Sequence, residues 1–425
     1  MVPEYDYIIV GGGLAGLYSA YKLNRREPSA KLLVLERNRA MGGRIDTIHN
    51  LEAGAGRFHD QHKLLLTLID ELGLTDKIRP ISSFEYYMPS KGPDRGKLFG
   101  WKPIDAIADK LLKINTPLPY DVTFLEFVKT KLTQEEIKLL LDFFGYSSEL
   151  TDMNAKDTIA LIRRHFNTRR QYYTMEGGLS QITERLIGRI NATMLTHRRV
   201  TFTGAAAASF ADVKRSQNTG GVRGTESPQG AEPSVWVQCE GIKRIYTARK
   251  CIFAVTKDTL LKLPIFKPIY PLLQKIQTLP LCRIYSQVPD LPKVKFTTNN
   301  NLRIVIPIDE KTNTVMISYT DNKYARFWKK MLDENGMEAV NREHQRLLTQ
   351  TLDREIKLPK RTQMYYWEHG VAYFAPGFDS ETMPKQIMRP FSNIPIFVCG
   401  ENYSEKNNQW MEGALDTSEY ILRAL

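Results

Sequence analysis

The chain has 425 residues, of which 42% are hydrophobic and 25% are charged, a composition typical of a soluble globular protein. This length exceeds what one simple core holds, so two or more domains are expected. The formal net charge is +12, but basic pairs such as Arg25-Arg26 and Lys329-Lys330 are scattered, which favours a generally basic surface over a nucleic-acid partner.

The first predicted elements are a strand, a glycine turn, a helix and a second strand. Residues 5–10 are β-prone, three glycines follow, and residues 14–23 have helical periodicity. Residues 30–36 then read as a strand that ends in Glu36. Strand, helix and strand within about 30 residues indicate a βαβ unit.

The glycine turn has the G-x-G-x-x-G spacing at Gly11, Gly13 and Gly16. The first glycine permits a tight turn, the second lets the backbone approach a pyrophosphate, and the third lets helix and strand pack closely. Glu36 is placed to accept hydrogen bonds from ribose hydroxyls. The unit therefore predicts a dinucleotide whose phosphates face the helix N-terminus; a glycine-rich turn without a ligand is the alternative.

The middle of the chain predicts helices. One helix is expected over 64–72, ended by Gly73. From 76 to 175 helices alternate with Pro- and Gly-containing loops, and Thr133 with Glu136 has capping-box spacing ahead of another helix.

The rest of the chain is richer in predicted strands, and the segment 214–234, polar and rich in Gly and Ser, is expected to be a surface loop. A long helical region is predicted from 333 to about 356. The final strand and helix resemble the first unit, so the cofactor domain is expected to be assembled from distant segments. The predicted strands lie at 198–204, 235–239, 249–254, 302–308, 314–320 and 396–401.

Two distant motifs resemble those of the flavin-containing amine oxidase family. In "ERNRAMGGRIDT", residues 36–47, Gly42, Gly43 and Arg44 match a G-G-R that follows the strand-two glutamate. In "VCGENYSEKNNQWMEGALDTSEYILRAL", residues 398–425, a G-E pair precedes an aromatic-x-E-G-A turn into a helix. The segments 173–181 and 365–377 are also similar to the family.

The resemblance implies FAD as the cofactor and an α/β fold, with a Rossmann-like GR2-type FAD-binding domain built from discontinuous segments and a mixed-sheet plus helical substrate domain. The helix N-terminus at Met411 is expected to face the flavin pyrimidine, where it favours negative charge. The implied domains are 1–75, 185–280 and 385–425 for FAD, 76–184 for a helical substrate cap, and 281–384 for a substrate-binding sheet and helix. The implied cofactor-binding residues are Gly11, Gly13, Leu14, Ala15, Gly16, Glu36, Arg37, Gly43, Arg44, Gly54, Ala55, Gly56, Arg57, Val200, Gly400, Glu401, Trp410, Met411 and Ala414.

For the substrate, "LEAGAGRFHDQH" at 51–62 resembles the segment in which L-amino acid oxidases carry a carboxylate-binding arginine, here Arg57. A guanidinium there pairs bidentately with a carboxylate. The same resemblance places Tyr319 on the carboxylate, Trp410 in the pocket wall and Trp367 near the flavin. It implies oxidation of the CH–NH2 group of an L-amino acid to an imino acid, then a keto acid and ammonia, with O2 reduced to H2O2.

Several alternatives stay open. Arg283 stands where many oxidases carry a lysine near the flavin, so another acceptor than O2 is one alternative. A primary amine or polyamine oxidase and a non-catalytic FAD-binding protein are others, and Tyr319 and Trp410 could be plain core residues. Gly370 offers no ring for an aromatic amine cage, which disfavours a monoamine. His369 leaves covalent flavin attachment open, and His59 is a candidate for the pocket rim.

The remaining composition predicts little further chemistry. The four cysteines have no C-x-x-C spacing and are expected to be reduced core thiols, and neither they nor the seven histidines show metal-ligand spacing. No stretch approaches the roughly 18 apolar residues of a membrane span, and no secretory leader is visible. A cytoplasmic protein with a small-molecule substrate is expected, with a homodimer possible.

Overall fold

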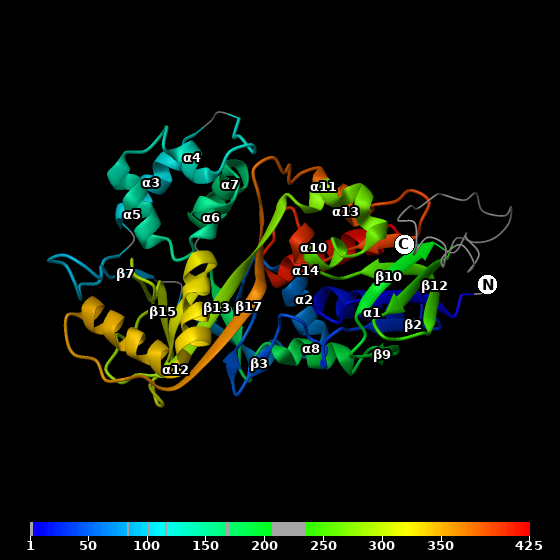
Figure 1. Cartoon of the computed structure of the whole chain (residues 1–425), viewed down its shortest axis with the longest axis horizontal. Helices are drawn as coiled ribbons and strands as arrows, with labels where there is room; N and C mark the ends of the chain where they lie inside the picture. The colour runs from blue at the N-terminus through cyan, green and yellow to red at the C-terminus, as the bar shows by residue number, and fades with distance from the viewer. Residues whose placement is uncertain (1–2, 83–84, 101, 115–116, 167–169, 206–233) are drawn as a thin grey trace. The chain divides into compact units, whose positions relative to one another are not determined.

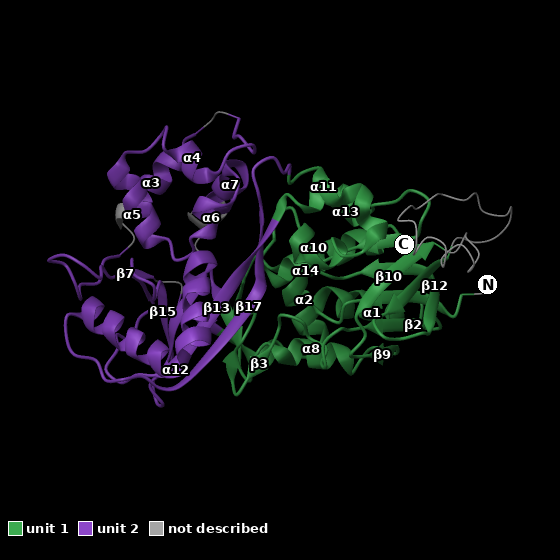
Figure 2. Cartoon of the chain, in the orientation of Figure 1, with its two compact units in different colours: residues 1–79, 173–276, 380–425 green, residues 80–172, 277–379 purple. Residues whose placement is uncertain are grey.

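The computed structural model describes residues 3–82, 85–100, 102–114, 117–166, 170–205 and 234–425. The chain divides into two compact units (Figure 2). Unit 1 comprises residues 1–79, 173–276 and 380–425, and unit 2 comprises residues 80–172 and 277–379. Each unit is therefore built from segments that are distant in sequence. The surface loop expected at 214–234 lies, except for its last residue, outside the described residues.

Unit 1 contains a sheet whose central strand is β1 (Tyr5–Val10). It runs parallel to β12 (Ile245–Phe253) on one side and to β2 (Leu32–Leu35) on the other. β9 (Thr193–Leu195) extends the parallel sheet beyond β2, and β18 (Ile396–Val398) extends it beyond β12. All four residues of β2 are buried, which accounts for its continuous apolar run because strands of a parallel sheet are covered on both faces.

The helix α1 (Leu14–Arg26) completes the predicted βαβ unit, which is confirmed. The C-terminal helix α14 (Met411–Leu422) packs on it (Figure 1). Ala15 accepts a hydrogen bond from Ser418, and Arg26 donates one to the carbonyl of Leu422. Because residue numbers rise together along both helices, α1 and α14 run parallel and their N-termini lie at the same end.

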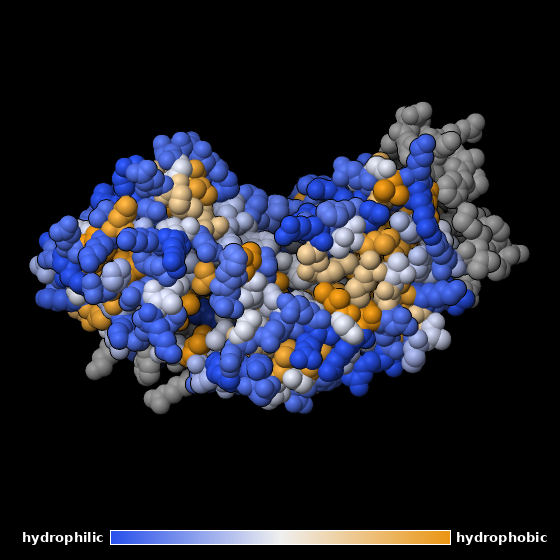
Figure 3. Space-filling view, turned by 90° about the horizontal axis from the view of Figure 1, so that it is seen from below, coloured by the Kyte–Doolittle hydropathy of each residue, from blue (hydrophilic) through white to orange (hydrophobic). Residues whose placement is uncertain are grey.

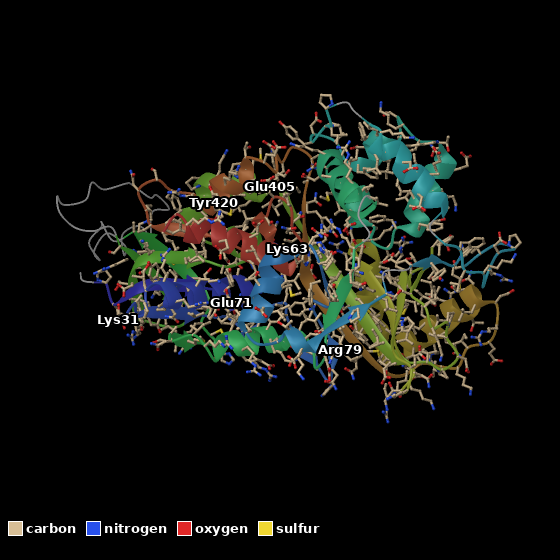
Figure 4. The ribbon with its side chains drawn as sticks, turned by 180° about the vertical axis from the view of Figure 1, so that it is seen from behind. Lys31, Lys63, Glu71, Arg79, Glu405 and Tyr420 are labelled. Carbon is tan, nitrogen blue, oxygen red and sulfur yellow. The ribbon has the colours of Figure 1, made fainter. Side chains whose placement is uncertain are left out.

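Helix α2 (Lys63–Glu71) joins this layer through charge pairs. Glu71 lies 3.0 Å from Lys22 and 3.0 Å from Arg25, both on α1; Glu71 and Lys63 are labelled in Figure 4. The predicted stop at Gly73 agrees with its positive φ of 69°. The other elements of unit 1 are β3 (Thr47–Ile48), β4 (Leu51–Glu52), β5 (Phe58–His59), η1 (Thr75–Lys77), α8 (Ser180–Ile187), β10 (Val200–Ala205), β11 (Val235–Cys239), α10 (Lys257–Leu260), η2 (Pro264–Ile269), α11 (Tyr270–Leu273), α13 (Met383–Met388) and η3 (Glu401–Tyr403).

Unit 2 contains a six-stranded sheet of order β17-β13-β16-β15-β14-β7. The predicted pair of strands is confirmed as β15 (Ile304–Asp309) and β16 (Thr314–Asp321), which are antiparallel. The remaining strands are β13 (Ile276–Gln287), β17 (Lys360–Phe374), β14 (Phe296–Thr297) and β7 (Tyr86–Tyr87). Two short strands, β6 (Ile78–Ile81) and β8 (Tyr172–Met175), lie where the chain passes between the units.

Among the described residues, five helices follow β7 in the chain and pack around their own apolar cluster. The expected capping box at Thr133 and Glu136 is confirmed, and a second one is formed by Thr123 and Glu126. Each box satisfies two backbone donors of a helix end. The helices are α3 (Lys102–Leu112), α4 (Phe124–Val128), α5 (Gln134–Phe143), α6 (Ser148–Thr151) and α7 (Ala155–Phe166).

The long helix α12 begins earlier than the sequence predicts. It spans Asn322–Leu352 and contains a non-helical residue, Gly336, with φ 77°. The prediction of a start at 333 was wrong because the first part buries only Ala325 and Trp328, too few apolar residues to give a clear period. The helix ends before Asp353, which has a left-handed conformation.

The four cysteines are buried free thiols, as predicted. Among the described residues, no helix is long and apolar enough to cross a membrane, and no group of three or more His, Cys, Asp or Glu side chains could hold a metal ion. Hydrophilic residues cover most of the face shown in Figure 3, with smaller apolar groups between them.

Unit 2 should lose stability in acid because of His344. Its imidazole is fully buried and stacks on Trp328 with ring centroids 4.1 Å apart, and burial lowers its pKa from 6.5 to about 3. Between these two values the unfolded chain binds the proton and the folded chain does not, so stability falls as pH falls from 6.5 towards 3. At pH 4.5 the loss is about 2–3 kcal/mol. Urea unfolding of wild type and His344→Leu from pH 8 to 4.5 should show a shallower pH dependence for the variant; parallel curves would contradict it.

Candidate functional site

The glycine turn between β1 and α1 presents only backbone. A Cβ on Gly11, whose φ is 107°, would lie 2.3 Å from the carbonyl oxygen of Ala254, and one on Gly16 would lie 2.0 Å from the carbonyl oxygen of Gly11. Gly43 approaches the same turn so closely that its Cβ would lie 2.9 Å from the Cα of Gly13. No side chain fits at these positions, so a ligand at the N-terminus of α1 would meet backbone, the arrangement that favours a phosphate.

Glu36, at the end of β2, has a structural role that the sequence did not show. Its side chain is buried and accepts hydrogen bonds from the backbone N–H of Gly12 and of Asn38, each at 2.8 Å. These bonds hold the glycine turn against β2. Each carboxylate oxygen has a second lone pair, so the arrangement is compatible with the predicted ribose contact.

Arg44 and Glu401, both predicted to bind the cofactor, lie next to each other. The Arg44 guanidinium is 2.6 Å from Glu401 Oε1, and Asn402 donates to Glu401 Oε2 at 2.6 Å. The segment that contains Gly54 packs on the Arg44 backbone, because a Cβ on Gly54 would lie 2.0 Å from the Arg44 carbonyl oxygen. Arg37 is exposed on the surface.

Glu412, in the first turn of α14, holds the start of α2. Its carboxylate accepts hydrogen bonds from the backbone N–H groups of Leu64 and Leu65, each at 2.9 Å. Burial raises the pKa of this carboxyl above its usual range and outweighs the opposing effect of the two amides. The glutamate of the closing motif thus fixes the segment that follows Arg57.

Replacement of Glu412 by Ala is expected to destabilise the protein by about 3 kcal/mol, because two buried backbone donors lose their acceptor. Urea unfolding at pH 7 measures the change. Glu405→Gln, in the loop before α14 and only partly buried, serves as the control and should change stability by less than about 0.5 kcal/mol. Equal effects of both substitutions would contradict the role of Glu412.

Arg57 and Trp410 come together over a pair of buried histidines in unit 1. The Arg57 guanidinium lies 5.8 Å from the centre of the Trp410 ring, within cation–π range. The rings of His59 and His62 lie 3.6 Å apart and meet Trp410 edge-on at 5.3 and 4.9 Å. His59 is only 3% exposed, so its ring packs against Trp410 in the interior, and the prediction of a position at the pocket rim was wrong. His62 was not predicted from the sequence, although its position three residues after His59 was a usable signal.

A second group of predicted residues lies in unit 2. Arg283 and Tyr319 are cross-strand partners on β13 and β16, and the guanidinium donates to the phenol oxygen at 3.2 Å. The guanidinium carbon also lies 4.6 Å from the Tyr319 ring centre, and Tyr146 meets that ring edge-on at 5.3 Å. Arg283 is buried. Tyr146, just before α6, was missed because only a tertiary contact reveals it.

Trp367 lies half-buried on β17. Further along this strand, a Cβ on Gly370 would lie 2.4 Å from the Cβ of Leu281, so close packing against β13 leaves no room for an aromatic ring there. His369 Nδ1 lies 3.2 Å from the hydroxyl of Thr278. The predicted site residues thus form two groups, with Arg57 and Trp410 in unit 1 and Arg283, Tyr319 and Trp367 in unit 2.

The features of unit 1 fit a dinucleotide cofactor. The backbone-only turn, the parallel N-termini of α1 and α14, and Arg44 all lie beyond the carboxyl ends of the parallel strands β1, β2 and β18. Ligands of open α/β sheets bind outside this edge. A pyrophosphate meets positive charge there from helix dipoles and from a guanidinium.

Comparison with known proteins agrees with this fit. A family model described as flavin containing amine oxidoreductase matches residues 14–420. An uncharacterized protein of Acanthamoeba polyphaga mimivirus is 22% identical over 496 aligned residues, which cover 99% of this chain and 93% of that protein. Protoporphyrinogen oxidase 2, chloroplastic/mitochondrial, of Arabidopsis thaliana is 25% identical over 167 residues, 37% of this chain and 28% of that protein. The structure of wild-type putrescine oxidase bound to putrescine superposes with a TM-score of 0.73 at 15% identity, covering 99% of this chain and 98% of that one, which shows a common fold.

Proposed function

Because the chain belongs to the family of flavin-containing amine oxidoreductases, with FAD as cofactor, we propose that it oxidises the CH–NH2 group of an L-amino acid. The turn at Gly11–Gly16, Gly43 and Arg44 would hold the pyrophosphate, with Glu36 on the adenosine ribose and Glu401 towards the ribityl chain. When bound, FAD supplies the two-electron acceptor for oxidation of the carbon–nitrogen bond.

The observation that carries the substrate proposal is the Arg283–Tyr319 pair. The phenol oxygen of Tyr319 accepts from a buried guanidinium, which polarises the hydroxyl and strengthens its own proton as a donor. A carboxylate oxygen is the natural acceptor for such a donor. The buried Arg283 guanidinium beside Tyr319 disfavours a diamine substrate, because the diamine would bring a second positive charge close to it.

Arg57 would provide the planar fork for both carboxylate oxygens, held over Trp410 by the contact described above. The substrate amine must be neutral when its α-hydrogen leaves, so the ammonium proton is lost first. The substrate then loses two electrons and becomes an imino acid, which water converts to a keto acid and ammonia. We propose O2 as the acceptor, which takes up two electrons and two protons as H2O2.

A substrate panel tests the proposal directly. The purified yellow protein is mixed without oxygen with each L-amino acid, its D-enantiomer, the corresponding decarboxylated amine, putrescine or protoporphyrinogen, and the flavin absorbance is followed. Bleaching by one or a few L-amino acids, followed by peroxide release in air, is expected. Bleaching only by amines or by protoporphyrinogen would overturn the substrate, bleaching without peroxide would overturn the acceptor, and no bleaching by any compound would overturn catalysis.

A further inference from the structure

Gln409 lies at the same edge of unit 1 as the glycine turn. It belongs to the loop that follows β18 and leads into α14, just as Gly11–Gly13 follow β1 and lead into α1. Because β1 and β18 both run parallel to β12 and the two helices run parallel, both loops lie at the carboxyl edge of the sheet. Gln409 is therefore next to the place where a dinucleotide binds this type of sheet.

The backbone of Gln409 is strained. Its φ is 73°, in the left-handed region that favours glycine. The surrounding contacts enforce this conformation: Asn407 accepts from the backbone N–H of Trp410, and a Cβ on Gly413 would lie 2.2 Å from the Asn407 carbonyl oxygen. Strain of this kind persists where the structure over-determines it, often at ligand sites.

The side chain of Gln409 adds a second, independent observation. Its amide nitrogen Nε2 is buried and has no hydrogen-bond partner among the described residues. A buried amide donor without a partner is costly, and native proteins rarely leave one. Glycine at this position would relieve the backbone strain, yet the chain has a glutamine there whose amide donor is buried. An acceptor on a bound ligand explains both features.

We propose that Nε2 of Gln409 donates a hydrogen bond to a carbonyl oxygen of the isoalloxazine ring of FAD. This assignment rests on the cofactor and not on the amino acid substrate. Reduction places negative charge on the ring, so the hydrogen bond is stronger in the reduced state. Gln409 therefore raises the reduction potential of the flavin as well as the affinity for FAD.

Three variants of Gln409 separate this role from a structural one. Gln409→Gly removes the donor and relieves the backbone, Gln409→Ala removes the donor only, and Gln409→Glu keeps the size but replaces the donor by an acceptor. Asn313→Gly is the matched control, because Asn313 also has a positive φ of 53° and lies in the exposed turn between β15 and β16. The readouts are the Kd for FAD, the flavin reduction potential by dithionite titration against a reference dye, and the Tm of the apoprotein; none needs a substrate.

Gln409→Gly is expected to fold with a Tm equal to or above that of wild type, as is Asn313→Gly. Its Kd for oxidised FAD should rise about ten-fold. Its affinity for reduced FAD should fall by a further factor of ten, which corresponds to a flavin reduction potential lower by about 30 mV. Gln409→Ala and Gln409→Glu should show the same losses, with Gln409→Glu the largest, whereas Asn313→Gly should show neither. Unchanged Kd and potential in Gln409→Gly would overturn the proposal, and a weaker affinity without a shift in potential would overturn the contact with the ring. Failure of every substrate in the panel would leave these readouts unaffected.

Discussion

Arg57→Met is expected to lower kcat/KM for the preferred L-amino acid by a factor of about 10² to 10⁴. The proposed fork makes two charge-assisted hydrogen bonds to the substrate carboxylate, each worth about 1.5–3 kcal/mol, and Met retains the length of the side chain without the charge. Most of the loss should lie in KM, because the carboxylate binds equally in the ground state and in the transition state. Steady-state peroxide assays over a range of substrate concentrations measure both constants.

Arg57→Lys keeps the charge but not the planar fork, so it should recover only part of the loss. The amine that lacks the carboxylate should react with wild type and Arg57→Met at similar, low rates. Tyr319→Phe should lower kcat/KM for the amino acid by about 10- to 100-fold, as expected for the loss of one hydrogen bond to a charged group. An equal loss of activity towards the amino acid and the amine would show that Arg57 supports the fold or the cofactor and does not bind the carboxylate.

The first βαβ unit of unit 1 could be predicted from sequence because its determinants are local. The glycine spacing and the acid at the end of β2 lie within one βαβ unit, and the structure confirms strand, helix and strand in that order. The family assignment and the α/β fold are likewise confirmed. The local pattern could not show which groups inside the protein these residues also bind. For example, Glu36 accepts a hydrogen bond from the backbone N–H of Gly12.

Unit 2 could not be predicted to the same depth. Tyr146 reaches Tyr319 only because a buried aspartate ties the start of α6 to the end of β16, a contact between residues more than 170 positions apart. Gln409 in unit 1 is a similar case, since its backbone conformation and its buried amide nitrogen give it its significance. A single sequence shows the residue types at such positions, and tertiary packing alone shows which of them face one another.

Asp321 provides that tie and is expected to be among the most sensitive positions for stability. It is fully buried, and its carboxylate accepts hydrogen bonds from the backbone N–H groups of Ser147 and Ser148, each at 3.0 Å, and from the Ser147 hydroxyl at 3.1 Å. Asp321→Ala leaves all three donors without an acceptor and leaves a cavity where the buried carboxylate was. A loss of about 3–5 kcal/mol in the free energy of unfolding follows.

Ser147→Ala is the matched control, because it deletes one of the three hydrogen bonds and leaves both backbone donors satisfied; about 1 kcal/mol is expected. The loss of stability in Asp321→Asn should fall between these two values. The asparagine oxygen still accepts from one backbone N–H, but its NH2 group faces the other N–H, so two donors oppose each other. Urea unfolding at pH 7 ranks the three variants. If the tie also positions Tyr146 against Tyr319, Asp321→Asn should raise KM for the amino acid while Ser147→Ala leaves it unchanged. A ranking in which Ser147→Ala costs as much as Asp321→Ala would show that the serine hydroxyl, and not the carboxylate with its two amides, joins α6 to β16.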